Sequence, residues 1–125
     1  MNEIVATTKF KRGGVKFMAV GYGLQYINPK FIEAERVRMF SEPHLLQINT
    51  PGFTRDFSLL LSNNHATGGT CFGDSGGPIF LNVEGYGKSI VAGLTSFGIN
   101  GKCAGTGGVY RLDNQEDINW ISGFF

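Results

Sequence analysis

Short stretches in which apolar and polar residues alternate run along most of the chain, and turn-forming residues separate them. Alternation with a period of two indicates β-strands, because successive side chains of a strand point to opposite faces. Proline, asparagine and glycine mark the breaks, as at Pro43 and at Asn100-Gly101. We predict strands at 15–20, 36–40, 45–48, 57–61, 78–83, 89–97 and 108–112. Six or seven short strands of this kind are typical of an antiparallel barrel or sandwich.

The end of the chain follows a different pattern. Asp113 with Glu116 three residues later resembles a capping box, and apolar residues then recur at helical spacing at positions 118, 121 and 125. The pattern predicts a terminal helix over 114–124, with an apolar side that includes Trp120 and packs against the rest of the fold. Residues 31–36 are too few for periodicity to decide between one helical turn and a strand.

Composition narrows the class of protein. A chain of 125 residues with 42% hydrophobic and 17% charged residues fits one globular domain, which we assign to 1–125. A net charge of +1 provides no field for a polyanion, so we expect no nucleic-acid partner. No stretch reaches the roughly 18 apolar residues of a membrane span. The first eight residues lack the apolar region of a secretory signal, so the protein is either cytosolic or part of a longer secreted chain.

The two cysteines allow two interpretations. Cys71 and Cys103 would close a loop of about 30 residues, and a bridge of that span typically contributes roughly 3 to 4 kcal/mol in an oxidising compartment. The alternative is a pair of small buried thiols. Two cysteines and two histidines without paired close spacing exclude a structural zinc site, and we expect no metal or cofactor.

Ser75 lies in the most distinctive stretch of the chain, Gly73-Asp74-Ser75-Gly76-Gly77. This stretch satisfies the G-x-S-x-G pattern of the α/β-hydrolases, in which an acid and a histidine follow the serine. No histidine lies beyond residue 75, and Gly76-Gly77-Pro78 would start a helix poorly, so that interpretation fails. A serine hydroxyl needs a neighbouring base to act as a nucleophile, and the candidates are His44 and His65.

Taken as a whole, the sequence resembles the chymotrypsin/trypsin family of serine endopeptidases. The motif Gly-Asp-Ser-Gly-Gly-Pro at 73–78, preceded by Cys71, is that family's nucleophile motif and is far more specific than G-x-S-x-G. Ser-Phe-Gly at 96–98 looks like the family's Ser-Trp-Gly strand, and Cys103 and Gly-Val-Tyr at 108–110 follow at the expected spacing. Gly-Tyr-Gly at 21–23 resembles the segment that opens the family's second barrel.

The resemblance covers about 15–125 but only the second half of the family's domain. It implies an all-β, six-stranded antiparallel Greek-key barrel with a C-terminal helix, and a missing first barrel that would carry the family's histidine and aspartate. His44, Asp56 and Ser75 follow the family's chain order, but His44 lacks the family's surroundings. We expect His65 to be a solvent-exposed loop residue.

The local roles in the family's site do transfer by resemblance. Ser75 would be the nucleophile, and the N–H groups of Gly73 and Ser75 would form the oxyanion hole. The family pairs the residue at Asp74 with a new N-terminal ammonium, so here Asp74 is expected to lack its partner. A disulfide between Cys71 and Cys103 would bridge a specificity pocket. The residues implied for its walls are Gly69, Thr70, Phe72, Ser96, Phe97, Gly98 and Gly108.

Gly69 stands where trypsin-like enzymes carry an aspartate, so the resemblance implies a pocket for a bulky apolar side chain rather than a cation. The implied function is peptide-bond hydrolysis by acyl transfer from Ser75 on a peptide or protein substrate, in a half-domain that is inactive alone. The implied partner is an N-terminal barrel or a second copy of the chain, and the implied location is secreted or periplasmic. The alternative is a non-catalytic peptide-binding module of the same fold.

Overall fold

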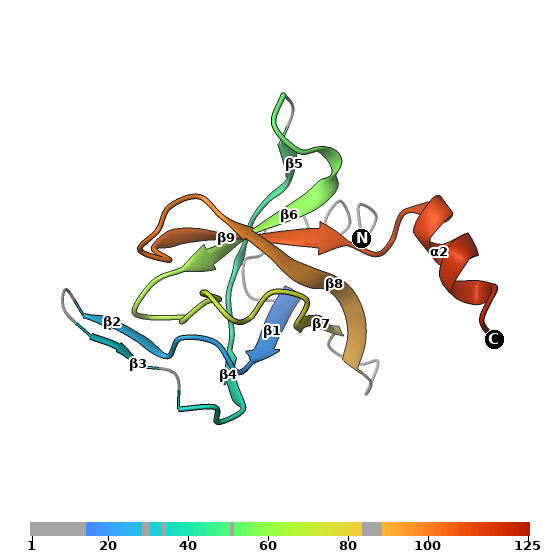
Figure 1. Cartoon of the computed structure of the whole chain (residues 1–125). Helices are drawn as coiled ribbons and strands as arrows, with labels where there is room; N and C mark the ends of the chain where they lie inside the picture. Colours follow the sequence, from blue (N-terminus) through green and yellow to red (C-terminus); the bar gives the residue numbers. More distant parts are fainter. Residues whose placement is uncertain (1–14, 29–30, 34, 51, 84–88) are drawn as a thin grey trace.

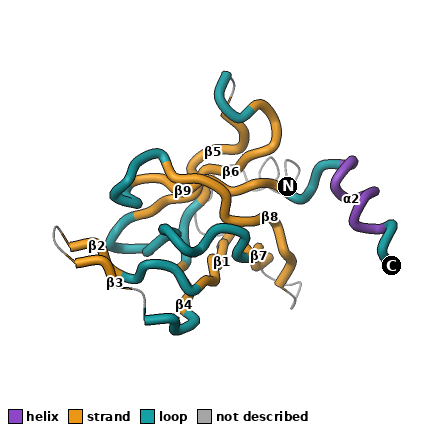
Figure 2. Tube along the Cα trace, in the orientation of Figure 1, coloured by secondary structure: helices purple, strands orange, loops and turns teal. Residues whose placement is uncertain are grey.

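The computed structural model describes residues 15–28, 31–33, 35–50, 52–83 and 89–125. The first residues, where the sequence predicts no signal peptide, lie outside this part of the chain. Strands make up most of it, and the helix α2 lies at its C-terminal end (Figures 1 and 2). The strands are β1 (Val15–Gly21), β2 (Tyr26–Asn28), β3 (Phe31–Glu33), β4 (Met39–Ser41), β5 (Leu45–Thr50), β6 (Arg55–Asn63), β7 (Pro78–Val83), β8 (Ser89–Gly98) and β9 (Gly105–Arg111), followed by α2 (Gln115–Ser122).

One antiparallel sheet of seven strands, in the order β4-β1-β7-β8-β9-β6-β5, contains all the long strands. The prediction of an all-β antiparallel fold with a C-terminal helix is confirmed, with seven strands in the sheet rather than six. The extra strand arises because β4 and β5, only three residues apart, pair at opposite edges: β4 with β1 and β5 with β6. Pro43 lies between them and has no N–H for a ladder. Because three residues connect them, the sheet curls so that the joined ends of these two edge strands lie close; closure into the predicted barrel stays a prediction.

The core lies on the inner face of this curled sheet. Alternate residues of four strands are buried there, each at most 3% exposed: Phe17 and Ala19, Leu59 and Leu61, Ile79 and Leu81, with Val109. Their spacing of two is the alternation that predicted the strands. The core holds β1, β7 and β8 in register, and the loop that carries Ser75 leads directly into β7.

A short hairpin outside the main sheet was not predicted. β2 and β3 pair with each other through Tyr26 and Glu33 at one end and Asn28 and Phe31 at the other. Three-residue strands are too short for an alternating pattern to be recognised. The segment 31–36, left open by the sequence, therefore begins as a strand, and residue 34 lies outside the described residues.

The C-terminal helix departs from its prediction in two ways. It spans Gln115–Ser122 with Asn114 as its N-cap residue, no side chain caps it, and none of its residues is buried. Trp120 and Phe124 are each 70% exposed and contact one another edge to face. The helix projects away from the sheet instead of packing its apolar side against it (Figure 1). A hydrogen bond from the Tyr110 hydroxyl to the Asp117 carboxylate ties it to β9 and raises the pKa of that hydroxyl.

Asp113 does not cap the helix because Arg111 binds it. The Arg111 side chain is nearly fully buried, and its Nε and Nη2 each donate to one Asp113 carboxylate oxygen over 2.8 Å. Its Nη1 donates to Asn49 in β5 over 3.0 Å. Partial burial acts to raise the pKa of the Asp113 carboxyl, but Arg111 opposes it and the pKa lies below its usual value. This pair joins the β5–β6 hairpin to the segment that leads into α2.

Asp113→Asn tests this pair. The lowered pKa means that ionised Asp113 stabilises the fold at pH values above its unfolded pKa of about 3.9, and that this contribution disappears as the pH falls through the folded pKa. We expect the variant to lower the free energy of unfolding by about 2 kcal/mol at pH 7. The deficit should shrink towards pH 3 in urea titrations. Asp56→Asn is the control, since only the main-chain carbonyl of Asp56 faces Arg111. An equal deficit at both pH values would contradict the assignment.

Candidate active site

The loop 71–77 forms two consecutive tight turns with Ser75 exposed at the second. The Asp74 N–H donates to the Cys71 carbonyl, and the Gly77 N–H donates to the Asp74 carbonyl. Gly73 and Gly76 have φ of 96° and 79°, in the left-handed region that favours glycine. The Gly76 N–H and the Gly77 carbonyl then bond to Thr95 in β8. The loop is thus fixed to the sheet immediately after Ser75.

Three of the free polar groups of this loop lie next to Asp74 and in Ser75. In the part of the chain that the structure describes, the N–H groups of Gly73 and Ser75 and the Ser75 hydroxyl have no hydrogen-bond partner. Both residues are exposed. Because both residues are exposed, these two amides, one on either side of Asp74, are accessible to an acceptor from outside the protein. Such amides can donate to an anionic oxygen next to the serine hydroxyl.

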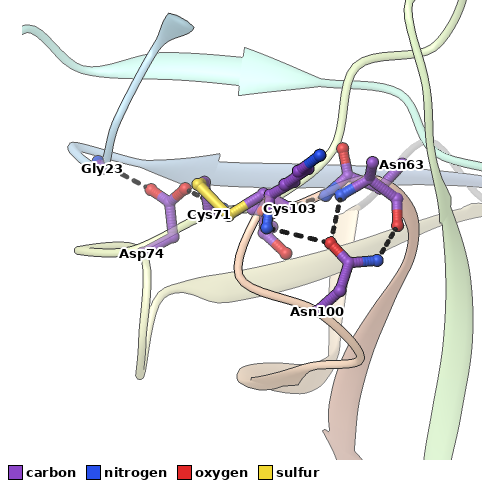
Figure 3. Close-up of a disulfide and its surroundings, with 9 residues drawn as sticks. Gly23, Asn63, Cys71, Asp74, Asn100 and Cys103 are labelled. Atoms are coloured by element: carbon purple, nitrogen blue, oxygen red, sulfur yellow. Dashed lines mark hydrogen bonds between the residues drawn. A yellow bond between two sulfur atoms is a disulfide. The ribbon is translucent and has the colours of Figure 1, made fainter. Parts of the chain in front are cut away.

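Asp74 accepts hydrogen bonds from two main-chain amides, which the sequence did not predict. Its Oδ1 accepts from the Gly23 N–H over 2.8 Å, and its Oδ2 accepts from the Cys71 N–H over 2.9 Å (Figure 3). Main-chain amides can stabilise a carboxylate without an ammonium group. The carboxylate therefore links the loop 71–77 to the segment that follows β1.

Glycines allow the two segments to approach this closely. A Cβ added at Gly23 would lie 2.6 Å from Asp74 Cγ, and one added at Gly73 would lie 3.0 Å from Gly23 Cα. The Leu24 N–H also donates to the Phe72 carbonyl over 2.9 Å. The Gly-Tyr-Gly stretch at 21–23 therefore packs directly against the loop 71–77, which we call the serine loop.

The disulfide predicted by resemblance is present. Cys71 and Cys103 are bonded with an S–S distance of 2.04 Å, so the alternative of two buried thiols is wrong (Figure 3). The bridge joins the serine loop to the β8–β9 loop. Asn100 holds that second loop by accepting from the N–H groups of Lys102 and Ala104 and donating to the Ala104 carbonyl.

A pocket of about 410 Å³ lies beside Ser75, and the predicted wall residues divide around it. Those that line it are Ser75, Thr70, Phe72, Ser96, Phe97 and Gly98, together with both cysteines. Gly69 and Asp74 instead line a neighbouring pocket of about 700 Å³. Gly108 is not part of the lining, because the ring of Phe97 covers it: a Cβ added at Gly108 would overlap that ring. Asn63 and Thr95 also line the smaller pocket and were missed from the sequence.

Neither histidine lines the pocket that holds Ser75. His44 is exposed in the β4–β5 connection, where its N–H donates to the Ser62 hydroxyl. His65 is exposed, as expected, and lines the larger pocket. In the described ranges no group of histidine, cysteine, aspartate and glutamate side chains could hold a metal ion, and no helix is long and apolar enough to cross a membrane.

Comparison with known proteins identifies the family. The trypsin family model matches residues 6–121, which is nearly the whole chain. The chain belongs to the trypsin family. No curated protein matches this trypsin-family chain significantly.

One similar solved structure is a mutant of human heparin binding protein, with a TM-score of 0.59 and 23% sequence identity. This likeness shows a shared fold. The match covers 88% of the trypsin-family chain but only 43% of the heparin binding protein chain. The chain therefore spans less than half the length of that structure.

Gly23→Ala tests the close packing of Gly23 against Asp74 in the serine loop. The added methyl group must displace the Asp74 carboxylate, and overpacking of this kind typically costs about 1–3 kcal/mol of unfolding free energy. Gly101→Ala is the matched control, because a Cβ there meets nothing within 4 Å. We expect the control to stay within about 0.5 kcal/mol of the parent chain in urea unfolding. Equal stabilities of the two variants would rule out the close approach.

Proposed function

We propose that the 125-residue chain is a single domain, the C-terminal half of a trypsin-like serine endopeptidase, with Ser75 as its nucleophile. The observation that carries the proposal is the pair of unpartnered amides, Gly73 and Ser75, beside the exposed Ser75 hydroxyl. Family membership and the adjacent pocket support it. A peptide substrate would place its side chain in that pocket and its scissile carbonyl at the serine.

The proposed chemistry is acyl transfer. Ser75 Oγ attacks the carbonyl carbon, its proton passes to a base, and the carbonyl oxygen becomes an oxyanion bound by the Gly73 and Ser75 N–H groups. Each such donor contributes roughly 3 to 4 kcal/mol to transition-state stability. The base then protonates the leaving amine, and water releases the acyl group. Since neither histidine lines the Ser75 pocket, we expect the base to come from outside this chain.

The missing partner in this proposal is an N-terminal barrel. Two features support it: the chain spans 43% of a structure with the same fold, and α2 presents Trp120 and Phe124 to solvent. Exposed apolar side chains gathered on one element mark an interaction site. A second copy of the chain is the other candidate occupant. The disulfide requires an oxidising compartment, which supports a secreted or periplasmic location.

The alternative is a peptide-binding module that keeps the pocket without catalysis. The similar structure carries the name of a binding protein, so the fold is not tied to one activity. Peptide binding that survives Ser75→Ala in every form of the protein, with no hydrolysis in any, would favour this alternative.

A fluorophosphonate probe tests the proposed half-domain. Removal of the base from a serine protease lowers turnover by roughly a millionfold, so we expect the isolated chain to label only slowly at Ser75 and to hydrolyse no peptide. Ser75→Ala should abolish the residual labelling, and Ser96→Ala in the same pocket should not. Rapid, stoichiometric labelling of the isolated chain would mean that it supplies its own base.

The coding sequence upstream of residue 1 completes the test. We expect it to encode a barrel with a histidine in an Ala-Ala-His-like context. The longer product should hydrolyse peptides and lose that activity on Ser75→Ala. A longer product without such a histidine, or without hydrolysis, would overturn the endopeptidase proposal.

A further inference from the structure

The pocket beside Ser75 is polar but carries no formal charge. Among the described residues, its lining contains no lysine, arginine, histidine, aspartate or glutamate. Three threonines and two asparagines contribute to it: Thr70, Thr95, Thr106, Asn63 and Asn100. The ring of Phe97 covers Gly108, one of the wall residues implied by the resemblance. This lining differs from the apolar slot implied by the family resemblance.

Thr95 is the first residue whose chemistry points to a ligand. It is 7% exposed and lines the pocket, and its Oγ1 is buried without a hydrogen-bond partner in the described part of the chain. Its main-chain groups are already bonded to Gly76 and Gly77. A buried hydroxyl without a partner costs about 1–3 kcal/mol. Because Thr95 lines the pocket, rotation about its χ1 can turn the hydroxyl towards a ligand, and a hydrogen bond to that ligand recovers this cost.

Asn63 is the second such residue. Its Nδ2 donates to the Thr70 carbonyl over 2.6 Å, which fixes the carboxamide in place. A Cβ added at Gly69 would lie 2.7 Å from Asn63 Cβ and would overlap its carboxamide. Asn63 therefore fills the space into which a side chain at position 69 would extend. Its Oδ1 accepts no hydrogen bond from the described residues and remains available as an acceptor.

We propose that Thr95 and Asn63 make this pocket selective for a carboxamide side chain, that of glutamine or asparagine, in an extended peptide. The carboxamide matches the two groups, because its N–H₂ donates to Asn63 Oδ1 and its oxygen accepts from the Thr95 hydroxyl. A charged side chain would be desolvated there without a counter-charge. An aliphatic side chain would leave both polar groups unpaired. The inference rests on the proposed function, since it assumes that the peptide lies at Ser75.

Binding to the isolated chain tests the inference without any need for catalysis. The ligands are Ac-Ala-Ala-Gln-NH₂ and its methionine, lysine and glutamate counterparts, and methionine matches glutamine closely in length. Dissociation constants are measured from NMR shifts of the ¹⁵N-labelled chain. We expect the glutamine peptide to bind best and to shift the amides of Gly73 and Ser75.

Thr95→Val should reduce the preference for glutamine over methionine by about five- to tenfold. Thr95→Ser, which keeps a hydroxyl, should retain the preference. Thr50→Val is the matched control, because Thr50 Oγ1 is also buried without a partner but belongs to β5, and Thr50 does not line this pocket. Removal of an unpaired hydroxyl is not expected to unfold either valine variant.

The outcomes separate the two proposals. If no peptide shifts the Gly73 and Ser75 amides, then no substrate site exists there and the proposed function fails together with this inference. If peptides bind at Ser75 but methionine or lysine is preferred, or if Thr95→Val leaves the preference unchanged, then only the carboxamide assignment is overturned.

Discussion

The hydrogen bonds from two main-chain amides to the Asp74 carboxylate are the interaction on which the candidate site depends. Gly23 lies after β1 and Cys71 lies in the serine loop itself, so Asp74 fixes the loop both to the sheet and to its own start. With the carboxylate held there, the chain turns so that the flanking amides of Gly73 and Ser75 have no partner within the described residues. The exposure of the free donors beside the serine hydroxyl thus depends on two part-buried hydrogen bonds.

The rest of the fold brings the parts of the site together. In the curled sheet β1 pairs with β7, and β7 pairs with β8. Gly23 after β1, the serine loop before β7 and Thr95 in β8 therefore lie close to one another. The disulfide then fastens the serine loop to the β8–β9 loop across the pocket. Two hydrogen bonds between Thr95 and the glycines after Ser75 join the pocket wall to the nucleophile loop. Any displacement of the loop must therefore disturb the pocket as well.

The sequence predicted what depends on local pattern. The alternation of apolar residues located the sheet strands to within a few residues. The resemblance predicted the disulfide, and five of the seven predicted wall residues line the pocket beside Ser75. The sequence-based predictions failed where a side chain binds a partner that lies outside the local pattern. Asp113 has the spacing of a helix cap but binds the buried Arg111, and Asp74 accepts hydrogen bonds from two main-chain amides that no local pattern predicts. The roles of Thr95 and Asn63 depend on a three-dimensional pocket, which no linear pattern encodes.

The helix α2 is present as predicted, but its packing was mispredicted for a related reason. Its apolar spacing is real, but the described part of the chain offers no surface that covers Trp120 and Phe124. The proposed half-domain would explain this exposure, because the apolar side of α2 would then pack inward in a longer protein. The same proposal would explain why free main-chain amides flank Ser75 while neither histidine lines its pocket.

Residue-resolved amide hydrogen exchange tests the central claim most directly, because one experiment measures the protection of the amides that bind Asp74 and of the amides that have no partner. The account predicts that the N–H groups of Gly23 and Cys71 are protected, while those of Gly73 and Ser75 exchange rapidly. Fast exchange at Gly23 and Cys71, or protection at Gly73 and Ser75, would contradict it.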